Sequence, residues 1–482
     1  MAGELDDARG TIKALEAMKV STDKVRVREL LTRSIAAILP STDALEKRLR
    51  SGERLRVYLG IDPTSPHLHL GHAVALLTLH RFQKLGHEVI LLVGDFTARI
   101  GDPTDKLSSR QPLSEKEVAA NMRTFKKQAT KLIAFAGKNP ARLAFNSTWH
   151  DKMKFGGLIS LAQKFTVQQM LKRDMFKKRL SFTFECSSCK NVQVIYQDPF
   201  NENGNINEEG KKEFFKDRAC EKCGKINHFG SELKEISAPK PIGLHEFLYP
   251  LMQGYDSVAL DVDVEVGGND QLFNMLAGRT LMSALKQKEK FVVTTKLLVD
   301  ASTGKKLSKT EQSLVNLDEE PNNMFGKVMA LPDRMIPAVA ELSTTMPMDE
   351  VKTLSKEQNP RDAKLTLAHE VVSLYHSPAK ADAAKEKWIK TFSEKSAPTD
   401  APELQLARKE ISALDLVLAT GIKSKSEARR LITQSAVELD GKVLTDSAEI
   451  LQIKSGAMLR IGKHRFWKLA DGKGSHPVAH GL

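Results

Sequence analysis

The stretch from Tyr58 to His72, Y-L-G-I-D-P-T-S-P-H-L-H-L-G-H, constrains the fold of this chain more than any other. The apolar run Leu55–Ile61 enters it with a strand pattern, a proline-containing turn follows, and a helical pattern begins near Leu70. A second apolar run, Val89–Val93, has the composition of a strand that is buried on both faces. Strand, helix and strand in this order predict a right-handed βαβ unit, and therefore an α/β fold built on a parallel sheet.

The start of that helix has features of an anion-binding site. His69 and His72 are three residues apart, so both lie on one side of the first turn. A helix N-terminus also presents unpaired N–H groups and a partial positive charge, which suit a phosphate. The spacing alone fits an ordinary surface turn as well, and no G-x-G-x-x-G sequence marks a dinucleotide site.

A second motif, late in the chain, favours the anion-binding interpretation. Residues Lys306–Thr310 read K-L-S-K-T, Gly304 precedes them, and an apolar strand pattern leads into them. The pair H-x-G-H and K-x-S-K-[ST] resembles the signature pair of class I aminoacyl-tRNA synthetases. The intervening sequence is similar to that of the bacterial type of tyrosyl-tRNA synthetase, and this resemblance covers nearly the whole chain. It implies that the substrates are L-tyrosine, ATP with Mg²⁺, and tRNA(Tyr).

The resemblance implies a set of residues that act on ATP. Transfer of this kind needs alignment, and compensation of the charge that develops on the leaving pyrophosphate, with little acid–base help. The catalytic residues implied are His69, His72, Lys306, Lys309 and Thr310. The ATP-binding residues implied are Thr64, His69, His72, Gly60, Asp62, Gly268, Asp270, Lys306 and Lys309.

The resemblance also implies a pocket for the amino acid. Tyr249, Gln253 and Asp256 follow one another at i, i+4 and i+7, so a helix would place them on one face. That spacing alone fits a stripe that faces solvent equally well. A pocket that hydrogen-bonds a hydroxyl rejects an analogue without it, because buried polar groups then stay unpaired. The substrate-binding residues implied are Tyr58 and Asp256 for the phenol, Asp102, Tyr249 and Gln253 for the α-ammonium group, and Gln271 beside the substrate.

All four cysteines of the chain fall in one polar stretch, residues 181–240. They form two C-x-x-C pairs, Cys186 with Cys189 and Cys220 with Cys223. Two such pairs supply the four thiolates of a tetrahedral structural zinc site, and a metal would stabilise a segment that has little apolar sequence for a core. The alternatives are four free cysteines or a redox pair. The insert is the one clear departure from the family pattern.

Composition narrows the class of protein further. The net charge of +13 favours a polyanionic partner. No apolar run is long enough to cross a membrane, and the N-terminus lacks the basic and apolar regions of a signal peptide. Four cysteines in so long a chain favour a reducing compartment over a disulfide scaffold. These observations predict a cytoplasmic protein.

A chain of 482 residues is long enough for two to four domains. The expected fold class is α/β, a Rossmann-like parallel-sheet catalytic domain followed by an α-helical domain and a small α+β S4-like RNA-binding domain. Residues 112–180 read as mostly helical; the resemblance implies that they form a homodimer interface, although their apolar face fits an ordinary core. The expected boundaries are 1–50 for an N-terminal helical extension, 51–318 for the catalytic domain with its 181–240 insert, 319–395 for an α-helical anticodon-recognition domain, 396–410 for a linker, 411–470 for the S4-like domain, and 471–482 for a tail.

The C-terminal part of the chain carries a basic cluster. Two helical patterns are joined at Gly421, and Lys423, Lys425, Arg429 and Arg430 lie at the start of the second. This arrangement resembles the S4 RNA-binding fold, in which basic side chains contact the RNA backbone. A solvated charged helix is the alternative interpretation.

Two other functions stay open on the sequence. One is a tryptophan-specific relative, which the Tyr58 and Asp256 pair disfavours because it suits a phenol better than an indole. The other is a non-catalytic RNA-binding protein, which the two intact motifs disfavour. The main prediction is therefore a tyrosine–tRNA ligase that forms tyrosyl-adenylate and pyrophosphate, and then transfers tyrosine to the 3′ end of tRNA(Tyr).

Overall fold

The structure is a computed structural model of the chain. It describes residues 19–102, 113–171, 176, 179–196, 219–225, 233–237, 242–300, 314–357, 359–393, 401–406, 408, 410–422, 424–462 and 465–471. The chain divides into two compact units, Met1–Asp382 and Ala383–Leu482, and each is described by itself. None of the helices in these described ranges is long and apolar enough to cross a membrane.

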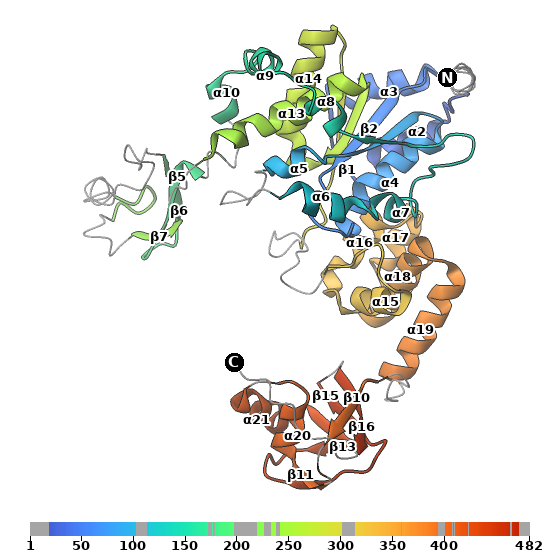
Figure 1. Ribbon diagram of the computed structural model, residues 1–482, viewed down its shortest axis with the longest axis vertical. Helices are drawn as coiled ribbons and strands as arrows, with labels where there is room; N and C mark the ends of the chain where they lie inside the picture. Colours follow the sequence, from blue (N-terminus) through green and yellow to red (C-terminus); the bar gives the residue numbers. More distant parts are fainter. Residues whose placement is uncertain are drawn as a thin grey trace. The chain divides into compact units, whose positions relative to one another are not determined.

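The first unit is built on a six-stranded sheet with the order β1-β9-β8-β2-β3-β4. Two of its strands, β1 and β2, are labelled in Figure 1. All neighbouring pairs are parallel except β1, which is antiparallel to β9. The chain runs outward from β2 through β3 to β4, and later returns on the other side as β8 and β9, so the direction of winding switches beside β2. In such sheets ligands bind beyond the carboxyl ends of the strands at the switch point. The strands are β1 (Ile35–Leu39), β2 (Arg56–Ile61), β3 (Glu88–Val93), β4 (Arg142–Phe145), β8 (Val264–Gly268) and β9 (Phe291–Thr295).

Helices cover the sheet and connect its strands. The apolar run Val89–Val93 is buried along its whole length, as expected for a central strand with cover on both faces. Helix α4 makes the predicted crossover from β2 to β3, which confirms the βαβ unit. The helices of this part are α2 (Lys24–Thr32), α3 (Thr42–Arg50), α4 (Leu70–Lys84), α5 (Thr97–Ile100), α6 (Glu115–Met122), α7 (Phe125–Ala129), α8 (Ser147–His150), α9 (Phe155–Ala162), α10 (Val167–Leu171), α13 (Leu244–Leu260) and α14 (Leu272–Lys286), with a short 3₁₀ helix η1 (Asn269–Gln271).

The N-terminal extension over 1–50 is not wholly helical, so that prediction is wrong in part. Residues Ile35–Leu39 form β1, which lengthens the central sheet at β9. Helix α2 ends at Thr32, and Ser34 turns the chain with a φ of 64°. The open edge of β9 offers backbone groups that need partners, and pairing with them outweighs the helical propensity of the alanines in I-A-A-I-L. Residues 1–18 lie outside the described part of the chain.

Residues 112–180 are mostly helical where they are described, but they also contain the strand β4, where the prediction of a helical stretch is wrong. Arg142–Phe145 pairs in parallel with β3 and forms the other edge of the sheet. A strand of four residues is too short for its periodicity to be distinguished from that of a helix.

The Cys-rich insert forms a small sheet of its own, with the order β6-β5-β7. All the described pairings in it are antiparallel. Its strands are β5 (Ser181–Cys186), β6 (Val192–Tyr196) and β7 (Leu233–Ser237).

Residues 319–393 are helical, as predicted, in the part that is described. The core of this region includes Phe325, Val339 and Val371, which are fully buried. The buried guanidinium of Arg33 donates to the main-chain oxygens of Glu341 and Thr344, and so ties the N-terminal segment to the end of α16. The helices are α15 (Pro321–Ala330), η3 (Asp333–Met335), α16 (Ile336–Ser343), α17 (Met348–Leu354), α18 (Pro360–Tyr375) and α19 (Pro378–Ser393).

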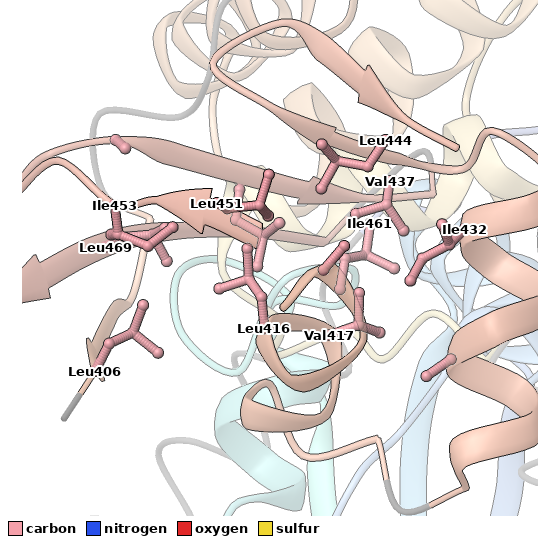
Figure 2. Close-up of a cluster of buried hydrophobic side chains, with 14 of the residues drawn as sticks. Leu406, Leu416, Val417, Ile432, Val437, Leu444, Leu451, Ile453, Ile461 and Leu469 are labelled. Carbon is pink, nitrogen blue, oxygen red and sulfur yellow. The ribbon is translucent and has the colours of Figure 1, made fainter. Parts of the chain in front are cut away.

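The second unit packs two helices on a five-stranded sheet with the order β10-β16-β15-β12-β13. Figure 2 shows its core, where Leu416 and Val417 of α20 meet Val437 and Ile461 of the sheet. This small α+β arrangement agrees with the prediction for the C-terminal region. The elements are β10 (Glu403–Leu406), β11 (Glu410–Ser412), α20 (Ala413–Ala419), α21 (Lys425–Thr433), β12 (Val437–Leu439), β13 (Lys442–Leu444), β14 (Ile450–Gln452), β15 (Met458–Ile461) and β16 (Arg465–Asp471).

The prediction that residues 396–410 form a linker is wrong for part of that range. Glu403–Leu406 form β10, which pairs in parallel with β16, and Leu406 is buried in the core shown in Figure 2. The alternating E-L-Q-L pattern is short and follows a Pro-rich segment, which favours a linker. Its pairing partner, β16, lies at the other end of the domain sequence. Residues 472–482, predicted as a tail, lie outside the described part.

Candidate active site

The two histidines of the first motif are brought together at the start of α4. His69 is the N-cap residue, and its Nδ1 accepts a hydrogen bond from the Gly71 N–H at 3.1 Å. The Nδ1 of His72 accepts from the His69 N–H at 3.2 Å, and the ring centroids are 3.9 Å apart. Because both Nδ1 atoms accept, the ring protons of the neutral imidazoles lie on Nε2. The helix start therefore adds two imidazole N–H donors to its own positive end.

The second motif, with Lys306, Lys309 and Thr310, lies outside the described residues. The chain that follows it is described from Leu314 onward, and it pairs with the first motif. The Leu70 N–H donates to the Val315 oxygen at 3.0 Å, and the Leu317 N–H donates to the Leu68 oxygen at 2.8 Å. The segment after the K-L-S-K-T motif is thus anchored beside His69 and His72.

Asp62 lies just beyond the carboxyl end of β2. Its two oxygens accept hydrogen bonds from Thr97 Oγ1 at 2.7 Å and from the Tyr249 hydroxyl at 2.8 Å. A Cβ on Gly94 would lie 2.0 Å from Asp62 Oδ1, so the loop after β3 needs a glycine at this position. The pKa of Asp62 is raised to about 7: burial raises it most, the hydrogen bonds from Thr97 and Tyr249 lower it, and the charges of Asp102 and Asp256 raise it.

Asp102 and Gln271 meet across the site. The Gln271 side-chain amide donates to Asp102 Oδ2 at 2.7 Å, and its own oxygen accepts from Asn274 at 3.0 Å. A Cβ on Gly268 would lie 2.4 Å from Asp270 Oδ1, so glycine lets the chain turn closely around Asp270. These contacts bring the loops after β3 and β8 together, as the topology requires.

The remaining predicted ATP contacts are on the same edge of the sheet. Gly60 is exposed near the carboxyl end of strand β2, and Thr64 is exposed in the loop that follows. The Thr64 N–H donates to the main-chain oxygen of Asp62 at 2.8 Å and closes a tight turn.

Asp256 is buried in the middle of the site, with 3% of its surface exposed. It accepts hydrogen bonds from Trp149 Nε1 at 2.8 Å, from His150 Nε2 at 2.8 Å, and from Asn146 Nδ2 at 3.3 Å. Burial raises the pKa of Asp256, and these donors oppose that effect by stabilising the anion. The donors come from α8 and the residue before it, directly beyond β4.

Tyr58 is fully buried on β2. Its hydroxyl shares a hydrogen bond with Ser257 Oγ at 3.0 Å. Burial raises the pKa of Tyr58 well above its usual value, and the charges of Glu265 and Asp256 raise it further, so the phenol stays protonated. Tyr58 and Asp256 therefore lie in one buried region, as their predicted shared role requires.

The polar stripe on α13 faces inward. Tyr249 and Asp256 are buried, and Gln253 is partly buried with its amide nitrogen 3.0 Å from Glu265 Oε1. The solvent-facing alternative for this stripe is thus excluded. The site also contains residues that sequence reasoning missed, and a glutamate inside the apolar strand V-E-V was the one available signal. The missed residues are Thr97, Asn146, Trp149, His150, Ser257, Glu265 and Lys290.

The four cysteines converge in the insert, and their sulfur atoms all lie within 4.8 Å of one another. Cys186 Sγ is 3.7 Å from Cys223 Sγ, and Cys189 Sγ is 3.7 Å from Cys220 Sγ. The four are free thiols rather than disulfides. A zinc ion with Zn–S bonds of about 2.3 Å places tetrahedral sulfurs about 3.8 Å apart, so this donor set fits the ion.

The basic cluster of the second unit lies on α21. Ala428 and Ile432 are the buried residues of this helix, whereas Lys425, Arg429 and Arg430 are exposed. Lys423 lies outside the described residues. The helix is therefore held by one apolar side and presents its cations to solvent.

Comparison with known families covers both units. The model of the tRNA synthetases class I (W and Y) matches residues 50–197 and 198–393, and the S4 domain model matches residues 414–456. A largely parallel sheet with the first motif at its carboxyl edge agrees with these matches. The fold is that of a class I aminoacyl-tRNA synthetase.

Individual relatives narrow the class. A tyrosine–tRNA ligase of Moorella thermoacetica is 37% identical over 460 residues, which are 94% of this chain and 97% of that protein. A tyrosine–tRNA ligase of Aquifex aeolicus is 36% identical and covers 89% of this chain and 95% of its own. The chain belongs to the tyrosyl-tRNA synthetase family. The prediction of an aminoacyl-tRNA synthetase that ligates tyrosine to its tRNA is confirmed, and the tryptophan-specific alternative is not supported.

Solved structures agree on the fold alone. A C-terminally truncated mitochondrial tyrosyl-tRNA synthetase of Coccidioides posadasii has a TM-score of 0.53 at 22% identity, and covers 80% of this chain and 100% of its own. The corresponding protein of Aspergillus nidulans has a TM-score of 0.55 at 23% identity, and covers 77% of this chain and 95% of its own. The expected α/β class is confirmed.

Proposed function

We propose that the residues at the carboxyl edge of the sheet carry out both steps of the family reaction. A carboxylate oxygen of L-tyrosine attacks the α-phosphorus of ATP, the bond to the bridging oxygen breaks, and pyrophosphate leaves. The terminal ribose hydroxyl of tRNA(Tyr) then attacks the carbonyl carbon of tyrosyl-adenylate, and AMP leaves. Such chemistry depends on alignment and on compensation of charge at the leaving group.

The observation that carries the proposal is the pair Tyr58 and Asp256. A buried hydroxyl and a buried carboxylate, each held by its own partners, form a site that recognises a phenol hydroxyl. Asp256 uses Oδ1 for Trp149 and His150, and among the described residues its Oδ2 has only the longer contact with Asn146 at 3.3 Å. The substrate phenol would donate to this second oxygen. Phenylalanine would leave Oδ2 of Asp256 without this donor.

The α-ammonium group of tyrosine would lie among Asp102, Tyr249 and Gln253, with Gln271 beside it. Gln253 donates its amide nitrogen to Glu265, so its carbonyl oxygen remains to accept from the ammonium. Gln271 already holds Asp102 by a 2.7 Å hydrogen bond. This end of the pocket is therefore rich in acceptors, as a cationic group requires.

ATP would lie across the start of α4. His69, His72 and Thr64 would bind its phosphates, and Lys306, Lys309 and Thr310 would compensate charge on the leaving pyrophosphate. Asp270, with the backbone at Gly60 and Gly268, would contact the ribose, and Asp62 would lie near the adenylate. Mg²⁺ bound to ATP would neutralise part of the phosphate charge.

Amino-acid-dependent exchange between ATP and pyrophosphate tests the proposal, with tyrosine, phenylalanine and tryptophan measured in parallel. Exchange with tyrosine alone is the expected result, because the pocket is built around a phenol hydroxyl. Exchange with tryptophan would overturn the pocket, and the absence of exchange with all three would overturn the catalytic assignment.

The transfer step would use the second unit to hold tRNA(Tyr). The exposed cations of α21 suit contacts with the RNA backbone. Truncation after Ser393 removes the whole small domain, including β10, so no unpaired strand is left behind. Adenylate formation should persist in this variant while tRNA charging falls. An equal loss of both activities would contradict the assignment.

The cysteine cluster would hold one structural zinc ion through Cys186, Cys189, Cys220 and Cys223. Its geometry supports a tetrahedral thiolate site, and the four free thiols suit a reducing cytoplasm. Metal analysis of protein purified under reducing conditions should find one zinc per chain. A metal-free protein with an intact insert would remove this proposal.

The protein would act as a homodimer. Helices α9 and α10 bury Leu161 and Met170 within the chain, which accounts for part of their apolar character. Other apolar side chains nearby remain open to solvent: Phe155 is 78% exposed, Val167 66%, and Leu244 84%. Large apolar side chains that are exposed near one another favour a protein partner. Analytical ultracentrifugation should show a dimer that Phe155→Glu weakens, and a monomer at working concentration would contradict the proposal.

A further inference from the structure

A buried lysine lies beneath the amino-acid pocket and belongs to none of the proposed catalytic or binding sets. Lys290 is fully buried just before β9. Its ammonium group donates to Glu265 Oε2, to Ser257 Oγ at 2.9 Å and to the Met275 oxygen at 3.0 Å. All three N–H donors of the ammonium group are thus used, and their acceptors lie on three different elements, β8, α13 and α14.

Glu265 connects this lysine to both ends of the pocket. It lies in register with Tyr58 on the neighbouring parallel strand, so the two side chains share a face of the sheet. Its Oε1 accepts from the Gln253 amide at 3.0 Å, and its Oε2 lies 3.4 Å from Ser257 Oγ. Ser257 in turn contacts the Tyr58 hydroxyl at 3.0 Å. One carboxylate therefore supports a residue proposed for the ammonium group and, through Ser257, one proposed for the phenol.

The surrounding backbone leaves room for this network. A Cβ on Gly278 of α14 would lie 2.4 Å from Lys290 Nζ and 2.7 Å from Ser257 Oγ. Burial lowers the pKa of Lys290, and the charge of Glu265 opposes that effect. A buried ion pair is a poor source of stability, since apolar residues of equal volume often stabilise as well or better. The network is therefore more readily explained by positioning than by stability.

We propose that Lys290, Glu265 and Ser257 form a positioning unit that sets the tyrosine pocket. Lys290 fixes the carboxylate of Glu265 through their ion pair, and Glu265 fixes the amide of Gln253 so that its oxygen faces the substrate ammonium. Ser257 Oγ accepts from Lys290 and donates to Glu265 Oε2 at 3.4 Å, so its second lone pair is left for the Tyr58 hydroxyl and restricts the rotation of that hydroxyl. This inference rests on the proposed function, because it assumes that Tyr58 and Gln253 contact tyrosine.

The test compares Lys290→Met with Lys288→Met in the full-length enzyme, by ATP–pyrophosphate exchange. Lys288 is two residues away, partly exposed, and paired with Asp263 at 3.0 Å outside the pocket. Lys290→Met should raise KM for tyrosine about 10- to 100-fold, the range for leaving a buried charge without its partner. KM for ATP should change less than about 3-fold, and Lys288→Met should change neither by more than about 2-fold.

Two further variants complete the test. Glu265→Gln combined with Lys290→Met removes both charges, and should recover part of the tyrosine affinity lost in Lys290→Met. Ser257→Ala removes only a hydroxyl, and should lower the preference for tyrosine over phenylalanine about 5- to 30-fold. Ser257→Ala decides the question if Lys290→Met does not fold.

The outcomes separate this inference from the proposed function. Equal changes in KM for tyrosine and ATP in Lys290→Met, or an unchanged tyrosine preference in Ser257→Ala, would overturn the positioning unit while tyrosine-dependent exchange by the wild type still supports the function. A wild type without tyrosine-dependent exchange would overturn both.

Discussion

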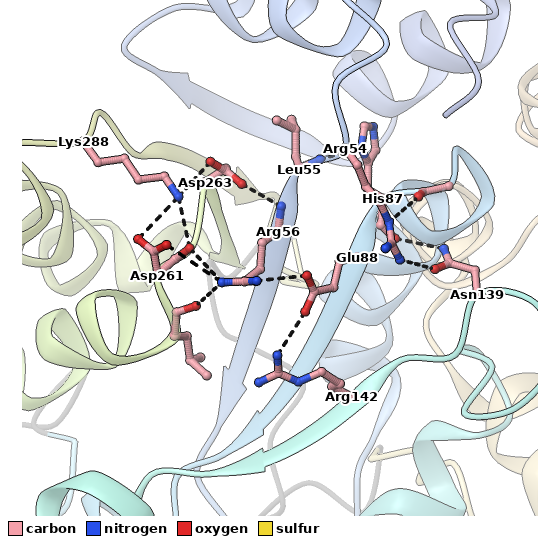
Figure 3. Close-up of polar contacts among 12 residues, drawn as sticks. Arg54, Leu55, Arg56, His87, Glu88, Asn139, Arg142, Asp261, Asp263 and Lys288 are labelled. Atoms are coloured by element: carbon pink, nitrogen blue, oxygen red, sulfur yellow. Dashed lines mark hydrogen bonds and ion pairs between the residues drawn. The ribbon is translucent and has the colours of Figure 1, made fainter. Parts of the chain in front are cut away.

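The amino edge and the carboxyl edge of the central sheet, where its strands begin and end, differ in the partners of their charged groups. At the amino ends of the strands, positive and negative groups alternate and pair directly (Figure 3). Arg56 Nε lies 3.0 Å from Glu88, Arg142 lies 3.1 Å from the other oxygen of Glu88, and Lys288 lies 3.0 Å from Asp263. These side chains are all partly exposed, so each pair contributes little net stability.

At the carboxyl ends the carboxylates have a different kind of partner. The hydrogen bonds described for Asp62 and Asp256 come from hydroxyl, amide, indole and imidazole groups instead of guanidinium or ammonium groups. These partners hold the two carboxyl groups in place without a guanidinium or ammonium charge beside them. At the amino edge, positive and negative side chains neutralise one another. The carboxyl edge instead offers acceptors to a ligand that carries hydrogen-bond donors and a positive charge. The donors are Thr97 and Tyr249 for Asp62, and Asn146, Trp149 and His150 for Asp256.

The strongest test of this contrast is Asp256→Asn. Loss of the charge, together with a mismatch against the donors Trp149 and His150, should raise KM for tyrosine about 100- to 1,000-fold. KM for ATP should change little, since Asp256 lies at the phenol end. Steady-state exchange kinetics measure both constants. Unchanged tyrosine affinity would mean that the phenol binds elsewhere.

A second test uses the pH dependence of stability. The pKa of Asp62 is about 7 in the folded protein and near 4 when the residue is exposed, so the folded state binds this proton more tightly. The contribution of Asp62 to the free energy of unfolding is therefore fully present below about pH 4 and is lost as the pH rises through about 7. Between pH 5 and pH 8 the free energy of unfolding should fall in both proteins, and the fall should be about 1–3 kcal/mol smaller in Asp62→Asn than in the wild type.

Denaturant unfolding at several pH values, without substrates, measures this difference. Parallel pH profiles for the two proteins would show that Asp62 is ionised throughout the range and that burial does not control it.

The smallest effect is expected at the amino edge. Glu88→Gln weakens the contacts of Glu88 with Arg56 and Arg142, both of which stay partly solvated. The free energy of unfolding should fall by about 0.5–1 kcal/mol, and kcat and KM for both substrates should stay within about 2-fold. A large kinetic effect would show that the two edges are coupled, and would break the comparison.

Much of the site was predictable because its signals are local. The pairing of His69 with His72 follows from helix geometry, and the two C-x-x-C pairs specify their own turns. The i, i+4, i+7 spacing predicts that the polar residues of α13 share one face. Whether that face points to solvent or into the protein was the one choice that the spacing left open. The strands β1 and β10 were missed, since short segments become strands only when a distant edge offers them hydrogen-bond partners.

The sequence by itself determined the βαβ unit, the two motifs, the cysteine pairs and the family, because periodicity and residue spacing survive without knowledge of long-range contacts. Only the tertiary structure decided that Glu265 lies beside Tyr58, that Lys290 reaches both Glu265 and Ser257, and that Asn146 and His150 hold Asp256. Strand register places these groups together, and a slip of one residue would turn Glu265 to the opposite face. The chemistry of a buried charge depends on such neighbours, which linear order does not specify.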